Sequence, residues 1–579
     1  MKPTGTLAAM ACLVAALAAG CSSQFYTADA DREVYSIVAD KNAAALGSDR
    51  RAFTISPNVD LPTLLDKSRG KPEMPLPEAP PAAAPKPADA AALDAAVPEN
   101  LPPPVPEPSP EAVRLTVGDA LRVAVRASRE YQTEKETVYL AAMALTLQRY
   151  MFRPHPFATG QVDFNNEYAD ARQRSWDPGA DVGISQQLAD GAIVAGSLGI
   201  TALKYLNQHL GDTVDSALDF SLSQPLWRGA GRKVVQENLL QAERNALYAV
   251  RSFAKFEQDF AVGIASNYLT VLQQRDVVMN QWQNYLSLKA GRERAEWLAK
   301  AERLAQFEVD QARQDELSAY NRWVVEREAY VNSLDAFKIT LGVPVATEIA
   351  LDPSEMKRLA ALGLQHPDIR LEDAIDKALV TRLDLANVRD GLEDARRKIL
   401  VAEDNLKGDV DLVASIGYAS RTDRPQSARI AFRRGDYAVG FDLDLPVDRL
   451  QERNALRQTQ VTLASTARAL DEDRDGVILD VRRALRRLEQ ARESYRIQQR
   501  SVALAERRVE STQLLLQAGR VSQRDVLEAE RALLTARNSL TSALVGHTVA
   551  GLQFQRDVGT LVVDEEGQIH GWNLTDAGR

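Results

Sequence analysis

The chain has 579 residues, a formal net charge of −10 and only 6% aromatic residues. Ala, Leu, Arg, Glu and Gln dominate, a composition that is typical of long helices. Basic residues are interleaved with acidic ones, so the sequence predicts no surface for nucleic acid. Beyond the N-terminus no stretch offers 18 uninterrupted apolar residues, which excludes a transmembrane helix from the predicted elements.

The N-terminus predicts export and a lipid anchor. Residues 1–20 have a basic start, an apolar stretch and small residues before Cys21, as a signal peptide does. The run from Leu17 to Cys21 resembles a bacterial lipobox, which implies cleavage before Cys21 and lipidation of its thiol. Ser22 rather than Asp follows, which implies sorting to the outer membrane. The alternative is an ordinary signal peptide with a chance cysteine.

A tether is expected between this anchor and the folded body. A short helix is predicted around Asp31–Lys41, and Lys71–Pro110 is rich in Pro and Ala. Such a segment cannot form a packed core, so we expect it to be semi-extended. It would hold the body at some distance from the anchor. The alternative is a linker without a specific role.

The first half of the folded body predicts a helix, short strands and then two long helices. Arg114–Met151 is helical by its periodicity. A turn is predicted at Asp177-Pro178-Gly179. The expected strands cover residues 162–168, 182–188, 193–203 and 215–224. Leu226–Ala301 and Phe307–Thr340 are the expected long helix and its return, and about 70 helical residues reach roughly 105 Å. A helix of that length must belong to a coiled coil or a stack of helices.

The second half repeats this plan. Strands are expected at residues 412–418 and 437–445, and helices over Val447–Gln517 and Ser522–Val558. Four short segments of the first half match segments of the second half in the same order. They are Asp119-Ala120-Leu121 with Asp373-Ala374-Ile375, Phe220–Pro225 with Phe441–Pro446, Val309–Ala312 with Val526–Ala529, and Leu341-Gly342 with Val558-Gly559. The interval from Ala120 to Pro225 is 105 positions and that from Ala374 to Pro446 is 72, so the first half holds 33 extra residues, enough for one hairpin. The repeat makes the protein pseudo-symmetric.

The expected organisation follows from these boundaries. It comprises a signal peptide (1–20), an anchor and tether (21–112), repeat one (113–345), a linker (346–368), repeat two (369–559) and a tail (560–579). The strands alternate apolar residues with Asp, Ser and Gly. This alternation fits a barrel strand between lipid and water, and it also fits a half-buried soluble hairpin.

The sequence carries no recognisable catalytic motif. Its five histidines are scattered without ligand spacing, and GxSxG, Walker A and CxxC motifs are absent. Gly229-Ala230-Gly231 follows a strand and opens a helix, but Val234 replaces the third glycine of a dinucleotide loop. We interpret it as a strand-to-helix junction. The sequence therefore predicts no enzyme, no cofactor and no metal site.

Two motifs, in their order and duplication, resemble those of the TolC-like outer-membrane efflux proteins. The first runs from Ser221 to Gly229, with Val439–Pro446 as its counterpart, and the second from Gln517 to Ala529. Arg531, Leu534 and Ala536-Arg537 follow the second motif. The resemblance covers about Leu115–Gly559.

The resemblance implies the fold class and the function. The fold is an α+β membrane protein with duplicated helix–strand–helix halves, in which a homotrimer builds a shared transmembrane β-barrel and a long periplasmic α-helical tunnel. The function is the passive exit duct of a tripartite efflux or type I secretion system for small molecules or polypeptides. The implied partners are a periplasmic adaptor (membrane fusion protein), an inner-membrane pump and outer-membrane lipid. The strand count agrees, because a few strands per chain cannot close a barrel.

The resemblance also implies roles for single residues. Asp525 and Glu528 match an acidic ring at the tunnel entrance, whose alternative is a solvated helix face paired with Arg524 and Arg531. The tips that would contact the adaptor are Leu304, Ala305, Gly519, Arg520, Val521 and Ser522. The residues expected to face the barrel lumen are Asp219, Ser221, Ser223, Asp442 and Asp444, and those expected to face lipid are Phe220, Tyr418, Tyr437 and Phe441.

Several alternatives stay open at this level. The tip of repeat one lacks the glycine of the tip of repeat two. In some family members basic and aromatic residues hold the tunnel closed, and the aligned positions here are Leu516 and Val521, so any closed-state latch must differ. The extra hairpin would either widen the barrel by two strands per chain or fold as a cap or plug. The competing functions are a periplasmic adaptor, which should carry one hairpin beside a lipoyl-like domain, and a structural coiled-coil lipoprotein.

Overall fold

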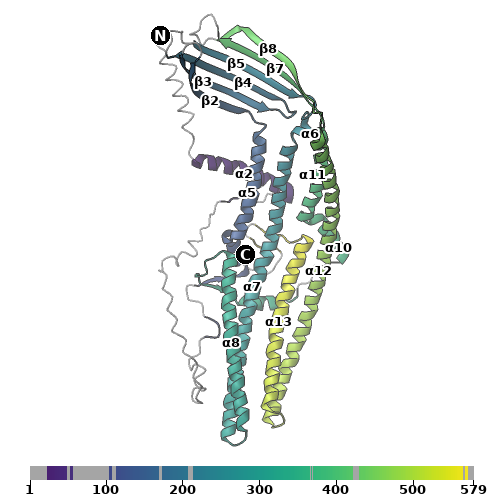
Figure 1. Cartoon of the computed structure of the whole chain (residues 1–579). Coiled ribbons are helices and arrows are strands. Elements are labelled where there is room, and N and C mark those ends of the chain that lie inside the picture. Colours follow the sequence, from purple (N-terminus) through teal and green to yellow (C-terminus); the bar gives the residue numbers. More distant parts are fainter. Residues whose placement is uncertain are drawn as a thin grey trace. The chain divides into compact units, whose positions relative to one another are not determined.

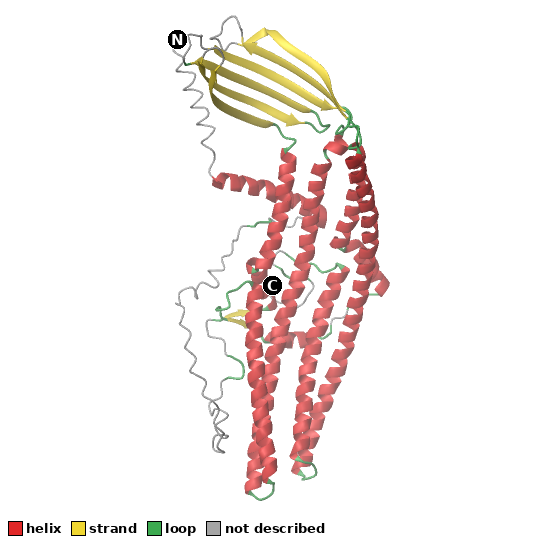
Figure 2. Cartoon of the chain, in the orientation of Figure 1, coloured by secondary structure: helices red, strands yellow, loops and turns green. Residues whose placement is uncertain are grey.

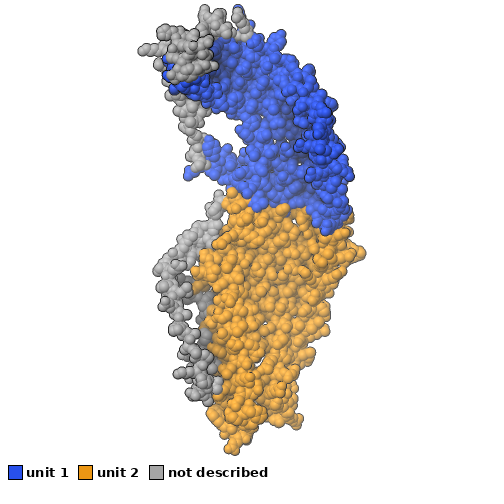
Figure 3. All heavy atoms as spheres, in the orientation of Figure 1, with its two compact units in different colours: residues 1–54, 137–251, 386–473 blue, residues 55–136, 252–385, 474–579 orange. Residues whose placement is uncertain are grey.

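The computed structural model describes residues 23–47, 53–55, 103–106, 112–168, 172–206, 213–364, 367, 369–420, 430–564 and 567–570. The signal peptide, Cys21 and most of Lys71–Pro110 lie outside these described residues. The chain divides into two compact units, of which unit 1 holds residues 1–54, 137–251 and 386–473 (Figure 3). Unit 2 holds residues 55–136, 252–385 and 474–579.

Two runs of helices follow the same plan with matching lengths (Figure 1). The first run is α4 (Val117–Ala127), α5 (Arg129–Tyr150), α7 (Glu237–Lys300) and α8 (Gln306–Leu341). The second run is α10 (Leu371–Thr381), α11 (Leu383–Asp404), α12 (Leu450–Gln517) and α13 (Gln523–Val558). α4 and α10 have 11 residues each, α5 and α11 have 22, and α8 and α13 have 36. The duplication read from the sequence is therefore present in the order and size of the helices.

The predicted single helix over Arg114–Met151 is wrong in two respects. The chain first forms the short strand β1 (Val113–Leu115), and the helix is then interrupted at Ser128, whose backbone is extended (φ −64°, ψ 129°). Arg382 takes the same conformation between α10 and α11 (φ −68°, ψ 121°). Periodicity did not reveal these breaks because a single extended residue leaves the apolar pattern on both sides intact.

Unit 1 contains an antiparallel sheet, drawn in yellow in Figure 2. Its six strands have the order β2-β3-β4-β5-β7-β8. The strands are β2 (His155–Tyr168), β3 (Arg172–Gln187), β4 (Ile193–Tyr205), β5 (Thr213–Pro225), β7 (Asp409–Ser420) and β8 (Ile430–Asp444). The expected strands are all present, and most are longer than predicted. The extra residues of the first half form β3 and β4, which lie inside this sheet.

The turn predicted at Asp177-Pro178-Gly179 is wrong, because these residues lie within β3. Asp177 and Pro178 pair with Asp163 and Val162 of β2. On the other side of β3, the pairing with β4 passes from Trp176 directly to Gly179. Proline has no N–H to donate, so it interrupts one ladder without ending the strand.

Helix α2 (Ser23–Leu46) covers the predicted helix around Asp31–Lys41 and packs within unit 1. Val34, Ile37 and Val38 are buried, and the Tyr139 hydroxyl of α5 donates to Asp31 Oδ1 at 2.8 Å. Burial and the carboxylate raise the pKa of Tyr139 to about 12. Helix α2 starts two residues after Cys21, so the predicted anchor is directly followed by a helix that packs within unit 1. The Pro/Ala-rich segment follows this helix.

The core of unit 2 gathers around the short helix α4 and the middle of α7. Leu121, Tyr268, Trp323 and Leu341 are among its buried residues. β1 pairs in parallel with β6 (Ile349–Leu351), which α9 (Ser354–Leu362) follows. The Tyr268 hydroxyl donates to the carbonyl oxygen of Leu115 at 3.0 Å. Within the described part of the chain, no helix is long and apolar enough to cross a membrane.

The same glycine joint closes each repeat in unit 2. Gly342 and Gly559 end α8 and α13 with φ angles of 77° and 74°. The backbone of Ala127, the last residue of α4, lies against Gly342, so that a β-carbon there would overlap its carbonyl oxygen. A β-carbon at Gly559 would lie 2.7 Å from Thr381 Oγ1, at the end of α10. Both positions therefore exclude any side chain.

We expect Gly342→Ala to lower the free energy of unfolding by roughly 3 kcal/mol or more, because left-handed strain and backbone overlap add. Gly519→Ala is the matched control. Gly519 has a φ of 68° but no atom within 4 Å of an added β-carbon, so its cost is about 1 kcal/mol. Thermal unfolding of the purified protein in detergent, followed by helical circular dichroism, measures both. Equal losses in the two variants would show that the close approach at Gly342 has no energetic weight.

Candidate functional site

The large sheet of unit 1 places its aspartates on one face and most of its large apolar side chains on the other. In an antiparallel sheet, residues paired across strands project to the same face. The registers therefore place Asp219, Ser221 and Ser223 of β5 on one face with Asp442 and Asp444 of β8. The five residues predicted to face a lumen thus share a face, which is called the acidic face below.

The acidic face carries more carboxylates than the sequence pattern indicated. Across the paired residues that are described, it holds ten aspartates and no Lys or Arg. They are Asp163, Asp177, Asp181, Asp215, Asp219, Asp409, Asp411, Asp436, Asp442 and Asp444. The seven additional aspartates lie at alternating positions of their strands, but only the register shows that all of them reach the same face.

Like charges lie directly opposite one another on this face. Asp163 pairs with Asp177, Asp409 with Asp444, and Asp411 with Asp442. Such cross-strand pairs are destabilising in a sheet. Arg228 forms an ion pair with Asp409, at the end of the strand. The concentration of carboxylates therefore works against the stability of the sheet and indicates a role outside folding.

The opposite face of the sheet is mostly apolar, with Arg174 and Lys204 near the ends of their strands. The four residues predicted to face lipid, Phe220, Tyr418, Tyr437 and Phe441, all lie on it. Tyr437 is 84% exposed and Phe441 is 65% exposed. No carboxylate lies on this face within the registered pairs of the described strands. A continuous exposed apolar surface of this kind marks contact with another apolar phase or partner.

In unit 2, the α12–α13 turn holds Gly519, Arg520, Val521 and Ser522. The N–H of Gly519 donates to Leu516 O at 3.0 Å and that of Arg520 to Leu515 O at 2.9 Å. This pattern is a Schellman motif, which requires a left-handed residue at the position of Gly519. The glycine therefore supplies the turn, as the sequence indicated.

The α7–α8 turn has the same geometry without a glycine. Glu302 N–H donates to Ala299 O at 2.9 Å and Arg303 N–H to Leu298 O at 2.9 Å. Glu302 has a φ of 57° and is the only non-glycine residue with a positive φ among those described. Leu304 packs partly against the cluster of Ala295, Val309 and Ala312, and Ala305 is exposed.

Asp525, on the first turn of α13, is a helix-capping residue. Its Oδ2 accepts from Ser522 N–H at 2.9 Å and from Ser522 Oγ at 2.7 Å. These hydrogen bonds hold the pKa of the Asp525 carboxyl below its ordinary value of 3.8. The carboxylate nevertheless remains exposed to solvent.

Glu528 lies one turn further along α13 and is also exposed. It pairs with Arg508 of α12 at 2.9 Å, not with Arg524 or Arg531. Arg531 instead pairs with Asp315 of α8 at 2.5 Å. The two acidic residues therefore share one helix face, three residues apart, and each has a structural partner that the sequence did not identify.

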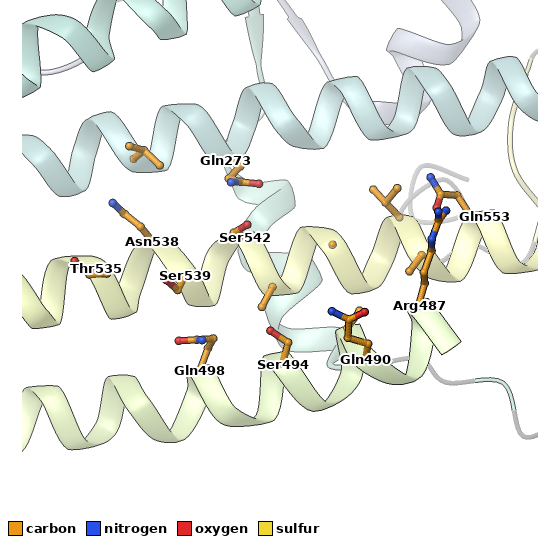
Figure 4. Close-up of a pocket in the computed structure, with 16 residues that line it drawn as sticks. Gln273, Arg487, Gln490, Ser494, Gln498, Thr535, Asn538, Ser539, Ser542 and Gln553 are labelled. Atoms are coloured by element: carbon orange, nitrogen blue, oxygen red, sulfur yellow. The ribbon is translucent and has the colours of Figure 1, made fainter. Parts of the chain in front are cut away.

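A polar cleft of about 790 Å³ lies between α7, α12 and α13 in unit 2 (Figure 4). Amides and hydroxyls dominate its wall, among them Gln273, Gln490, Ser494, Asn538 and Ser542, and Arg487 is its one charged lining residue. It has no paired acid and base and no activated nucleophile. In the described residues, no group of His, Cys, Asp or Glu is placed to hold a metal ion.

Gly229-Ala230-Gly231 lies between β5 and the short helix α6 (Arg232–Val235), as a strand-to-helix junction should. Gly229 and Gly231 have positive φ angles of 73° and 93°. Gly229 N–H donates to Asp404 Oδ2, at the end of α11, at 2.7 Å. The junction thus connects the sheet to the helices within unit 1.

Residues 374–545 match the family described as outer membrane efflux protein. Three solved structures resemble the chain. The outer-membrane channel OprN has 12% identity, coverage of 77% of this chain and 90% of that one, and a TM-score of 0.55. CusC has 14% identity, coverage of 80% and 99%, and a TM-score of 0.56. The Campylobacter jejuni CmeC outer membrane channel has 14% identity, coverage of 80% and 88%, and a TM-score of 0.52. At these identities the likeness establishes the α+β fold of long helices and antiparallel strands. No curated protein sequence matches the chain.

We expect Glu302→Gly to raise the free energy of unfolding by about 1 kcal/mol, because it removes left-handed strain from the α7–α8 turn. Glu302→Ala is the control, since alanine keeps the β-carbon that causes the strain. The midpoint of thermal unfolding in detergent checks both variants. A gain in the alanine variant as large as in the glycine variant would assign the effect to the lost charge.

The lowered pKa of Asp525 predicts a pH dependence. A carboxyl with a depressed folded-state pKa adds stability above its unfolded pKa and loses it as the pH falls through the folded pKa. Asp525→Asn should therefore lower the unfolding midpoint at pH 7, and the difference from wild type should vanish well below pH 3.8. Ser522→Ala should weaken the same pH dependence, because the side-chain hydrogen bond is lost while the backbone N–H of residue 522 remains. If the unfolding midpoints of wild type and Asp525→Asn still differ at low pH, the stability difference does not come from the ionised carboxylate.

Proposed function

We propose that this chain, whose residues 374–545 match the outer membrane efflux protein family, is the outer-membrane channel of a tripartite efflux system. The main support is the sheet of unit 1, with one exposed apolar face and one face of ten aspartates. An apolar face toward lipid and a polar face toward water are what a membrane-spanning sheet requires. The channel is passive, and the chain is not an enzyme.

The functional unit is a homotrimer with a shared barrel and a periplasmic helical tunnel. Six strands leave two open edges, and an open edge cannot face lipid, so further copies must complete the sheet. The long helices extend over 64 and 68 residues and need neighbouring helices for their exposed apolar side chains. An adaptor and an inner-membrane pump are the partners. A type I secretion system is the related alternative.

The two helical turns are the proposed adaptor contacts. Arg520 and Ser522 are exposed, whereas Leu304 and Val521 are half-buried. The α7–α8 turn differs in shape and charge from the α12–α13 turn, because Glu302 occupies the position that corresponds to Gly519. The adaptor therefore meets two unlike tips in each chain.

Asp525 and Glu528 are the proposed acidic ring of the tunnel entrance. Their exposure supports this role, and a trimer would bring six carboxylates around the axis. Together with the acidic face of the sheet, they would attract cations and repel anions along the path. The substrate class favoured by this charge is cationic or net positive.

Cys21 is the proposed lipid anchor. It lies outside the described residues, but α2 begins two residues later and carries the exposed rings of Phe25 and Tyr26. Aromatic side chains of this kind are common at the membrane interface. An anchor there would place the docked α2 close to the inner leaflet of the outer membrane.

Planar-bilayer conductance of the purified protein, after its oligomeric mass is measured, tests the function. We expect a trimer with small, cation-selective channels. Asp411→Asn with Asp442→Asn should lower the ratio of cation to anion permeability by a factor of about two, because the lumen potential falls. Asp525→Ala with Glu528→Ala should enlarge the conductance.

The matched control removes two carboxylates from α2, by Asp29→Asn with Asp40→Asn. These residues are exposed and lie outside the proposed path, so selectivity should stay unchanged. A monomer or dimer without conductance under any condition would remove the channel function and favour a structural lipoprotein. A channel whose selectivity responds equally to both pairs would remove the role of the acidic face.

A further inference from the structure

The hairpin β3–β4 has no counterpart in the second half of the chain. β2 begins five residues after α5 ends, and β7 begins five residues after α11 ends. β5 and β8 both lead into the matched prolines Pro225 and Pro446. β2 therefore corresponds to β7 and β5 to β8, which identifies β3 and β4 as the inserted elements.

The insertion lies in the middle of the sheet. β2 pairs with β3, β3 with β4, and β4 with β5, so that β2 and β5 do not touch as β7 and β8 do. A cap or plug would leave β2 beside β5 and fold outside the ladder. The hairpin instead adds two strands to the wall.

Both faces of the sheet continue across the insertion. Trp176, Val182 and Ile184 of β3 and Val194 and Leu198 of β4 lie on the apolar face, and most of them are about half exposed. Asp177 and Asp181 of β3 lie on the acidic face with Ser197 and Thr201 of β4. A hairpin surrounded by water would have no reason to gather large apolar side chains on one face.

The two open edges of the sheet suit each other. β2 and β8 are the outer strands, with 14 and 15 residues, and each is long enough to span a bilayer as a tilted strand. Every neighbouring pair is antiparallel, and an even number of strands makes β2 and β8 run in opposite directions. β8 of one copy can therefore continue the antiparallel order onto β2 of the next copy.

This head-to-tail contact closes the sheet with every copy in the same orientation across the membrane. Pairing β8 with β8, or β2 with β2, around a two-fold axis would place the two copies in opposite orientations. The β8-to-β2 contact repeats from copy to copy until the ring closes, and it keeps all apolar faces outside. No edge then remains in lipid.

We infer that β8 of each chain pairs with β2 of a neighbouring copy, and that three copies with six strands each close a sheet of eighteen strands. The inference rests on the proposed trimeric channel. Barrels of about 16 to 18 strands leave an aqueous channel, and the diameter grows roughly linearly with strand number. Without the insertion, three copies with four strands each would give twelve. The hairpin thus widens the outer end of the path and adds Asp177 and Asp181 to its lining.

Disulfide cross-linking of the full-length protein in outer membranes tests the contact. One cysteine is placed on the outward face of β2 and one on that of β8. The nine pairs combine Ala158→Cys, Val162→Cys or Phe164→Cys with Tyr437→Cys, Val439→Cys or Phe441→Cys. At least one pair should give covalent dimers and trimers that reductant dissolves, because directly opposite residues lie within disulfide reach.

The control replaces the β2 cysteine by Leu198→Cys on β4, an interior strand that should form no link between copies. A trimer without any β2–β8 link, or with links from β8 to Leu198→Cys, would overturn the inference while leaving the channel intact. Loss of the trimer in the wild type would instead defeat the proposed function.

A deletion variant provides a second measurement. Removing residues 172–205 lets β2 pair with β5, as β7 pairs with β8. The largest neutral polymer that enters from the outer side should become smaller, because the barrel falls from eighteen strands to twelve. An unchanged polymer cut-off in a deletion variant that still forms trimers would place the hairpin outside the wall and overturn the inference.

Discussion

The constraint on which each repeat depends is the close approach of a short helix to the glycine that ends the returning helix. Gly342 and Gly559 have left-handed backbones, and the ends of α4 and α10 lie where a β-carbon would be. Each joint connects the first short helix of a repeat to its last long helix. The single extended residue that follows, Ser128 or Arg382, then starts the next helix. The three helix pairs of equal length, α4 with α10, α5 with α11 and α8 with α13, all adjoin these joints.

The sheet illustrates a balance between folding and function. Three aspartate pairs face each other directly across strands, an arrangement that costs stability. The opposite face is exposed and apolar, which would also be unfavourable in water. Both features are reasonable only if lipid covers one face and water with mobile cations covers the other. The proposed channel function would therefore explain two unfavourable features at once.

The two helical turns show how similar backbones serve different surfaces. Glu302 and Gly519 form the same hydrogen-bond pattern, yet one is a charged residue under left-handed strain and the other is free of strain. The second turn adds the Ser522–Asp525 cap, while Ala305 offers no side-chain cap at the start of α8. Strain and the missing cap make the α7–α8 turn less stable than the α12–α13 turn. A partner that binds the α7–α8 turn would therefore stabilise its conformation more.

The sequence by itself determined the duplicated plan, the long helices, the strand alternation and the shared face of five polar strand residues, because periods of 3.6 and 2 are local properties of the chain. Only the tertiary structure decided that β3 and β4 lie inside the sheet, that Asp177-Pro178-Gly179 continues a strand, and that ten aspartates share one face. It also supplied the partners of Asp525 and Glu528. Strand register and ion pairs join residues far apart in the chain, and no local pattern encodes which distant segment a strand or a charge will meet.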